Sequence, residues 1–580
     1  MTHHHSTTCR GFRGALSLGL ALTVFSATLH GRSDRLPEAA APAPASILSD
    51  RPAGALAVAE PAPRRAETRA EVNRVVEIVF TATEPPADPF TRVTLDVVFT
   101  EPTGGTRTVP AFWAGERRWK ARYASPLVGI HRYRSQSSDP ADKGLHGVEG
   151  TIEILPYRGA NPLYRHGPIR VAANRRHFEH LDGTPFFWLA DTWWKCLSRR
   201  LTWEGFQELA ADRQAKGFSV ALLVCGPYPD EAPFDPRWAN EGGMPYETRD
   251  FSVVNPAYFD HADRRIGHLV EAGIVPAIVG GWGREQAGGK STIAVVGREG
   301  YQRHWRHLVA RYGAYPTCWI VGGEASDAQG PWSEVAHHLR AVDAFQRLVA
   351  VHPQGFPRRA LADQTPFDFD LVVPGHDSWR TAQSTLSQLR ECLTLEPRKP
   401  VLNGESCYER HMQENFEDLQ RHLFWSCVLS GAAGHTYGAA GIWQASVEGD
   451  PGITPVYDWT TWREGMHFPG STQLGLGRRL LEQFPWWQFE PHPEWVEPGG
   501  FAAGIPARVR LIYVRKPGIY QWKGPQLKGL EENLGYRATY FDPVSGRRHE
   551  AGVLRGANEV LAPALPSPQD WVLILEAMTS

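Results

Sequence analysis

The sequence lacks an excess of charge of either sign. Its 61 Lys and Arg residues are matched by 63 Asp and Glu residues, so the formal net charge at pH 7 is only −2. A chain so nearly neutral has no global field that would draw it onto nucleic acid or an anionic membrane surface. We therefore expect no nucleic-acid partner.

Cysteine motifs are also missing. The seven cysteines, at positions 9, 196, 225, 318, 392, 407 and 427, include no CxxC pair and no tight Cys/His spacing of the kind that holds structural zinc. We expect buried free thiols, and neither a metal nor a cofactor. One or two disulfides remain the alternative for an exported chain.

No apolar run near the N-terminus is long enough for a membrane span, which needs about 20 consecutive apolar residues. Arg10 and Arg13 precede a shorter apolar run at 15–24, and small residues follow it. This order is typical of a secretory signal. We expect residues 1–30 to be a signal peptide, the protein to be secreted or periplasmic, and the mature chain to have no integral span.

Residues 31–72 are rich in Ala, Pro and Arg and show no sustained apolar periodicity, which predicts a disordered linker. Short alternating segments separated by Pro and Gly turns follow over 73–158, and the same pattern returns over 485–580. Alternation with a period of two predicts half-buried strands. Both segments are therefore expected to be β-sandwich domains.

Residues 165–484 alternate short β-branched or aromatic runs with helical stretches, which is typical of repeated βα units around a parallel sheet. The strand candidates are 186–190, 218–224, 274–280, 317–323, 347–353, 369–375, 399–404 and 431–438. Eight units predict an α/β protein with a (β/α)₈ TIM barrel flanked by N- and C-terminal β-sandwiches. An open doubly wound sheet is the alternative, but no G-x-G-x-x-G follows the first strand and no P-loop occurs.

Two glutamates stand at expected C-terminal strand ends, each directly after glycine. Glu324 follows the fourth strand and Glu405 the seventh. The chemistry of a barrel enzyme lies at this end of the strands, so both side chains could converge on one sugar. Glycosidic hydrolysis needs two carboxyl groups, one to protonate the leaving oxygen and one to attack or stabilise the anomeric carbon. The alternative is that each glutamate caps a helix or pairs with arginine.

Other polar and aromatic residues at expected strand ends could line a substrate subsite. These candidates are Asp191, Trp193, His352, His376, His435, Tyr437 and Trp443. Tryptophan can stack on a sugar ring, and Asp191 could bind sugar hydroxyls. Each also has a structural alternative: a cap for Asp191, a satisfied core histidine for His435, and plain packing for the aromatic residues.

Several motifs together resemble the DUF4038 apiosidase-like glycoside hydrolases, which often carry an N-terminal DUF5060 sandwich and a C-terminal collagen-binding-like domain. The motifs are FFWLADTWW, RQAKGFSVALL, the Gly-Gly-acid at 322–324, KPVLNGESCYE, GAAGHTYGAAGIWQ and YFDPVSGRRHE. The resemblance implies release of apiose from pectic side chains, with the fourth-strand acid as proton donor and Glu405 as nucleophile.

One position departs from the family pattern. The fourth-strand acid is usually aspartate, whereas this chain has Glu324. The extra methylene group lengthens the reach of the carboxyl group, which leaves the identity of the sugar open.

Two other functions are alternatives. A metal-dependent hydrolase could use His352, His376, Asp377 and His435, but the first strand ends in Asp-Thr-Trp rather than a His-x-His pair. Alternatively, the barrel could be a degenerate scaffold whose sandwiches bind carbohydrate or matrix protein. The presence of both glutamates favours a glycoside hydrolase acting on a plant or microbial polysaccharide, most simply with a retaining mechanism.

Overall fold

The structure is a computed structural model that describes residues 68–228, 234–283, 291–449, 459–498, 500–515 and 522–578. The expected signal peptide (1–30) and the linker up to residue 67 lie outside these residues. Residues 68–71, assigned from the sequence to the linker, instead form strand β1 (Thr68–Glu71), which pairs in parallel with β8 (Glu149–Leu155). The sandwich therefore starts five residues earlier than the expected boundary at 73.

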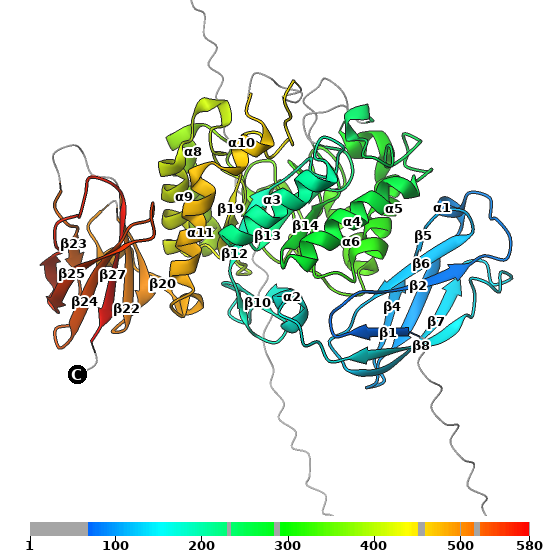
Figure 1. Cartoon of the computed structure of the whole chain (residues 1–580), viewed down its shortest axis with the longest axis horizontal. Coiled ribbons are helices and arrows are strands. Elements are labelled where there is room, and N and C mark those ends of the chain that lie inside the picture. The colour runs from blue at the N-terminus through cyan, green and yellow to red at the C-terminus, as the bar shows by residue number, and fades with distance from the viewer. Residues whose placement is uncertain are drawn as a thin grey trace, which may run out of the picture. The chain divides into compact units, whose positions relative to one another are not determined.

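The N-terminal domain is a β-sandwich (Figure 1). One sheet has the order β1-β8-β7-β3-β4 and the other β2-β6-β5. Phe99 stacks on Tyr123 at 4.0 Å between ring centroids, which joins the two sheets through the core. The remaining elements are β2 (Val76–Thr81), α1 (Pro89–Arg92), β3 (Leu95–Thr100), β4 (Thr106–Pro110), β5 (Phe112–Trp113), β6 (Arg118–Tyr123) and β7 (Gly129–Ser137).

The central domain contains all eight expected strands in one parallel sheet, in the order β16-β15-β14-β13-β12-β19-β18-β17. This confirms the (β/α)₈ fold predicted from the sequence. The strands are β12 (Trp188–Thr192), β13 (Val220–Val224), β14 (Val275–Val279), β15 (Cys318–Ile320), β16 (Val349–Ala350), β17 (Asp370–Val372), β18 (Val401–Asn403) and β19 (Gly434–Tyr437).

The barrel is nearly closed. Among the described residues no ladder pairs β16 with β17, and the two edges meet through one backbone bond, in which the Asp368 N–H donates to the Val349 carbonyl at 2.8 Å. This gap falls at the fifth-to-sixth connection, where the sequence shows no convincing helix. Only the four-residue helix α7 (Pro357–Ala360) occurs there.

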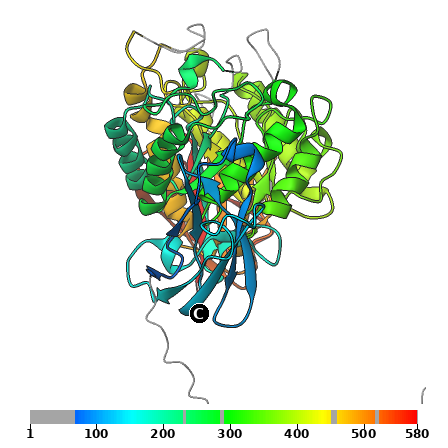
Figure 2. The same ribbon diagram turned by 90° about the vertical axis from the view of Figure 1, so that its right-hand side faces the viewer.

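Helices lie outside the barrel strands in both Figure 1 and Figure 2. They are α3 (Trp203–Lys216), α4 (Pro256–Glu271), α5 (Thr292–Tyr312), α6 (Trp332–Val342), α8 (Ser378–Thr394), α9 (Glu417–Leu429), α10 (Trp462–Met466) and α11 (Pro469–Leu481). A short sheet precedes the barrel, made of β9 (Ile169–Val171), β10 (Phe178–His180) and β11 (Pro185–Phe186), after helix α2 (Pro162–Arg165).

Each barrel strand is buried on both faces, because one face lines the barrel interior and the other packs on helices. Trp188 and Ala190 of β12 belong to the interior cluster, whereas Leu189 packs with side chains of the helices. Successive residues of a strand point to opposite faces. In β12, odd-numbered residues such as Leu189 therefore face the helices, and even-numbered residues such as Trp188 face the interior.

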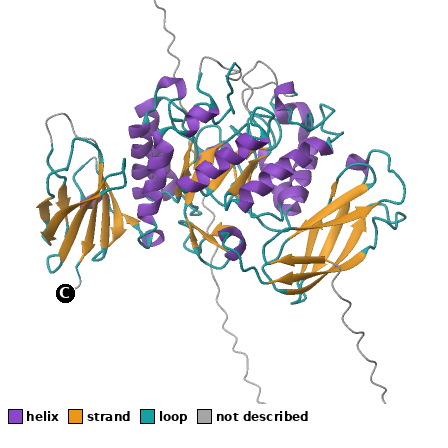
Figure 3. Ribbon diagram, viewed as in Figure 1, coloured by secondary structure: helices purple, strands orange, loops and turns teal. Residues whose placement is uncertain are grey.

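The C-terminal domain is the second strand-rich domain (Figure 3). A six-stranded sheet, β20-β21-β22-β27-β24-β25, is accompanied by the two-stranded sheet β23-β26. Its strands are β20 (Glu490–Pro491), β21 (Phe501–Ile505), β22 (Val509–Val514), β23 (Gln526–Lys528), β24 (Gly535–Phe541), β25 (Arg548–Arg555), β26 (Glu559–Leu561) and β27 (Trp571–Ala577). Arg421 on α9 binds Asp570 through two hydrogen bonds of 2.8 and 2.7 Å.

The six cysteines among the described residues are buried free thiols, as the sequence predicts. Within the described residues, no helix has the length and apolar character that crossing a membrane requires.

Candidate active site

Glu405 follows β18 directly after Gly404, at a point where two strands come close together. A Cβ atom on Gly404 would lie 2.7 Å from the Cβ of Leu371 on β17, so only glycine fits. The glutamate side chain is almost completely buried. Its two carboxylate oxygens contact two imidazole rings: Oε2 lies 2.5 Å from Nε2 of His352, and Oε1 lies 3.0 Å from Nε2 of His376.

Backbone amides determine which nitrogen of each ring carries the proton. The Glu324 N–H donates to Nδ1 of His352 at 3.2 Å, and the Tyr408 N–H donates to Nδ1 of His376 at 3.3 Å. A nitrogen that accepts a hydrogen bond cannot itself carry a proton. In both rings the proton therefore sits on Nε2 and is donated to Glu405.

Glu405 is consequently held as a carboxylate. Burial by itself would raise its pKa, but the interactions with His352 and His376 outweigh this and hold the pKa well below the ordinary value for glutamate. A carboxylate that accepts two N–H donors has no proton to give. It can act as a nucleophile or base, and not as the acid that protonates a leaving group.

Glu324 occupies a backbone conformation that residues other than glycine rarely adopt, with φ of +43°. The two preceding glycines have no room for a side chain, because a Cβ on Gly322 would lie 2.4 Å from the Trp332 ring and one on Gly323 would lie 2.1 Å from the Trp282 ring. Left-handed backbone at a non-glycine residue is common at functional sites. The half-buried Glu324 and the buried Glu405 thus border the same imidazole, that of His352.

Aromatic side chains pack against the His352 and His376 rings. Trp194 and Trp282 lie 5.5 and 5.3 Å from the His352 ring between centroids. The Trp194 Nε1–H donates to the Tyr408 hydroxyl at 2.9 Å, and the Tyr408 ring lies 4.3 Å from that of His376. The arrangement leaves each histidine ring little freedom to turn.

Trp443, proposed from the sequence as a sugar platform, lies 6.3 Å from Tyr408 and 6.1 Å from His411 between ring centroids. The candidate list did not include Trp282, Tyr408 and His411. A signal for Trp282 was present, since it follows two glycines after the third strand just as Glu324 does after the fourth. Tyr408 and His411 offered no such signal, because their approach to His376 depends on how the loop after Glu405 folds.

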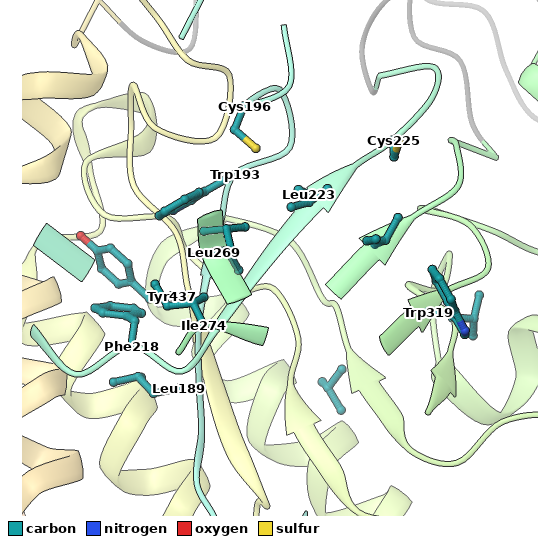
Figure 4. Close-up of a cluster of buried hydrophobic side chains, with 14 of the residues drawn as sticks. Leu189, Trp193, Cys196, Phe218, Leu223, Cys225, Leu269, Ile274, Trp319 and Tyr437 are labelled. Carbon is teal, nitrogen blue, oxygen red and sulfur yellow. The ribbon is translucent and has the colours of Figure 1, made fainter. Parts of the chain in front are cut away.

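Four predicted subsite residues lie elsewhere, on the helix-facing side of the barrel wall. Asp191 forms a buried ion pair with Arg213 of α3, with 2.6 Å between Oδ2 and Nε. It also accepts the Trp193 Nε1–H at 2.8 Å. Figure 4 shows Trp193 and Tyr437 among buried apolar side chains that include Leu189. The structure therefore gives Asp191 and Trp193 structural contacts in place of the predicted subsite role.

His435 and Tyr437 on β19 share this orientation. The His435 ring lies 5.6 Å from Phe424 of α9, and burial lowers its pKa to about 3. The Tyr437 hydroxyl donates to Oε2 of Glu409 at 2.5 Å. His435 pairs with Leu189 and Tyr437 pairs with Asp191 in the register of β12 and β19, so both side chains face the helices and point away from Glu324 and Glu405.

The histidines named for a metal site do not converge. His352 and His376 meet at Glu405, whereas His435 packs against α9. In the part of the chain that the structure describes, no group of three or more His, Cys, Asp or Glu side chains is arranged to hold a metal ion.

Comparison with known families identifies the domains. The model "Apiosidase-like, catalytic domain" matches residues 172–488, more than half of the chain. The chain belongs to the apiosidase-like family. A second model, the domain of unknown function DUF5060, matches residues 69–138 within the N-terminal sandwich. Both matches confirm the resemblance read from the motifs, and this apiosidase-like protein is a glycoside hydrolase.

Solved structures share the fold. A structure from Bacteroides vulgatus ATCC 8482 named as a putative glycoside hydrolase has a TM-score of 0.67 and 17% identity, covering 88% of this chain and 100% of its own. A family 5 glycoside hydrolase from the same organism has a TM-score of 0.58 and 20% identity, covering 72% and 95%. Among curated proteins, no significant match was found.

Proposed function

We propose that this apiosidase-like protein is a secreted, retaining glycosidase in which Glu405 is the nucleophile and Glu324 the acid/base. The observation that carries the proposal is that the Nε2–H groups of His352 and His376 both donate hydrogen bonds to the Glu405 carboxylate. These hydrogen bonds keep the carboxyl group ionised. The backbone N–H of Glu324 donates to the other nitrogen of the His352 ring, which supports assigning the Glu324 side chain as the second carboxyl group.

The two steps of a retaining reaction assign one task to each residue. In the first step a carboxylate oxygen of Glu405 bonds to the anomeric carbon, the glycosidic C–O bond breaks, and the leaving oxygen takes the proton of Glu324. In the second step Glu324 takes a proton from water, the water oxygen bonds to the anomeric carbon, and the bond to Glu405 breaks.

For the substrate, we propose a sugar on a plant or microbial polysaccharide, with apiose on a pectic side chain as the first sugar to test. Family membership supports this choice. Glu324, in place of the usual aspartate, carries its carboxyl group one methylene further from the backbone. Products released from a panel of pectic and algal polysaccharides would identify the sugar.

The roles are tested with Glu324→Gln and Glu405→Gln on an aryl glycoside with an acidic phenol. Glu324→Gln should lose turnover of the natural substrate but still release the activated phenol, because that leaving group needs little protonation. Added azide should then intercept the glycosyl-enzyme with net retention. Glu405→Gln should show no burst and no covalent intermediate.

Glu334→Gln serves as the matched control, since Glu334 lies in the first turn of α6 and its side chain is 59% exposed. It should behave as wild type. Rescue of Glu405→Gln with retained stereochemistry, or wild-type rates in either site variant, would refute the assignment.

Secretion is proposed from the arginines, apolar run and small residues of the N-terminal segment. Expression of the full chain followed by N-terminal sequencing of the exported protein tests it. We expect a new N-terminus near residue 30. A chain that stays in the cytoplasm with residues 1–30 intact would contradict the proposal.

A further inference from the structure

His352 lies between Glu324 and Glu405, and each of its two ring nitrogens contacts a different glutamate. Nδ1 accepts the backbone N–H of Glu324 at 3.2 Å, and Nε2 donates to the carboxylate of Glu405 at 2.5 Å. Glu324 and Glu405 are 81 residues apart in the chain and follow strands β15 and β18, which are not neighbours in the sheet. One imidazole ring therefore makes a hydrogen bond to each of the two glutamates.

The backbone of His352 holds the same loop. Its N–H donates to the Gly322 carbonyl and its carbonyl accepts the Ala325 N–H, both at 3.1 Å. Glu324 itself lies between these two bonds, in the left-handed region. Nδ1 of His352 thus accepts the backbone N–H of Glu324. Glu324 is the residue of this loop whose backbone conformation is least favoured.

His376 provides an internal comparison. It donates Nε2–H to the same carboxylate, at 3.0 Å, but its Nδ1 accepts from Tyr408 rather than from Glu324. The two histidines therefore offer Glu405 the same chemical group. They differ in the backbone N–H group from which the other ring nitrogen, Nδ1, accepts a hydrogen bond.

We propose that His352 is a positioning residue that couples the acid/base to the nucleophile, while His376 positions the nucleophile alone. The inference rests on the proposed roles of Glu324 and Glu405. It also replaces the predicted role of His352 in binding sugar: the ring nitrogens are both engaged by the catalytic residues and leave no hydrogen-bonding nitrogen for a sugar hydroxyl.

Two substitutions separate the functions of the ring. In His352→Asn the amide oxygen can replace Nδ1 as acceptor for the Glu324 N–H, while the donor to Glu405 is lost. In His352→Gln the longer side chain can bring an amide N–H to Glu405, while the acceptor for Glu324 is lost. The same two substitutions at His376 are the matched controls.

The readout is kcat/KM for a series of aryl glycosides whose phenols differ in pKa. Loss of acid catalysis makes the rate depend more steeply on the leaving group, because a poor leaving group needs the proton most. His352→Gln should lose about tenfold with poor leaving groups and less than about threefold with good ones. His352→Asn should lose a similar factor with every leaving group, as should His376→Asn.

His376→Gln should keep the wild-type dependence on the leaving group. The inference is overturned if His352→Gln also keeps it, or if His376→Gln steepens it equally. Glu324→Gln in the same series separates failure of the coupling role of His352 from failure of the proposed acid/base role of Glu324. If that variant shows no steeper dependence, the acid/base assignment itself is wrong.

A second measurement uses the unmodified protein and does not depend on whether the variants fold. Imidazole ¹H–¹⁵N spectra of the full chain should show His352 and His376 protonated on Nε2 only, with the resonances assigned by through-space contacts of His352 to Trp194 and Trp282 and of His376 to Tyr408. Protonation on Nδ1 of His352 would overturn the inference, because the Glu324 N–H could not then donate to it.

Discussion

Asp191 offers the sharpest test of what the barrel wall does, because the sequence and the structure assign it different roles. Its carboxylate accepts three hydrogen bonds: from the Thr192 N–H at 2.9 Å, the Trp193 Nε1–H at 2.8 Å and the Arg213 Nε–H at 2.6 Å. Asp191 and Arg213 are both fully buried. In Asp191→Asn the charge disappears, and the new amide N–H₂ faces groups that are themselves donors.

The expected cost follows from the burial of Arg213. Breaking a buried ion pair on one side typically costs about 3–5 kcal/mol, and although Arg213 keeps its ion pair with Asp212, the Nε side of its guanidinium group is left without an acceptor. At about 2.1 cal/mol/K per residue, a barrel of roughly 320 residues has an unfolding entropy near 0.7 kcal/mol/K, so each kcal/mol shifts Tm by about 1.5 °C. We expect Asp191→Asn to lower Tm by about 5–7 °C.

The assay is thermal unfolding together with kcat and KM on an aryl glycoside. The structural role predicts a lower Tm with KM nearly unchanged at a temperature where the variant is folded. The double variant Asp191→Leu/Arg213→Met should recover part of the lost stability, because it leaves no unpaired charge. A wild-type Tm combined with a tenfold higher KM would refute this reasoning and restore Asp191 as a sugar ligand.

Two further predictions concern a buried carboxyl group and a glycine. Burial raises the pKa of Glu409 to about 7 even though Tyr437 donates to it, so the folded state should lose about 3 kcal/mol of stability as pH rises from about 4.5 to 7. Glu409→Gln has no carboxyl group to ionise and so lacks this loss. The Tm of the variant minus the Tm of wild type should rise by about 4 °C between pH 5 and 7.5. A Tm difference that stays constant over this pH range would contradict the prediction. Gly323→Ala should displace the Trp282 ring, which would lie 2.1 Å from the new Cβ, and should cost about 1–3 kcal/mol and lower kcat. Gly267→Ala, where the nearest neighbouring atom is 3.9 Å away, should leave Tm and kcat unchanged; equal effects in both variants would show that packing at Gly323 is not the cause.

Much of the fold could be predicted because its signals are local. Eight short apolar runs separated by helical stretches became eight parallel strands, and the alternating segments on either side became strand-rich domains. Glu324 and Glu405 could be proposed as the catalytic pair because each follows a glycine at the end of a strand, and a barrel brings such ends together at one mouth. The end of the linker could not be predicted from the sequence, because β1 is a strand only through its pairing with β8.

The orientation of the strands could not be read from the same signals. All five residues of β12 are buried, so Asp191 lies in a run whose two faces look equally apolar in the sequence. Which face points into the barrel depends on closure of the sheet. For this reason Asp191 and Tyr437, sought in the subsite, are held instead by Arg213 and Glu409 on the helix-facing side.

The sequence by itself determined the family and a barrel flanked by strand-rich segments, and it proposed the two glutamates, because each of these depends on residue type, periodicity and spacing along the chain. Only the tertiary structure decided what surrounds the glutamates. His352 and His376 donate to Glu405 because β16, β17 and β18 end at one mouth, and their protonation is set by amides of Glu324 and Tyr408 that no local pattern could connect to them. The tautomer of an imidazole depends on its neighbours in space, and those neighbours come from distant parts of the chain.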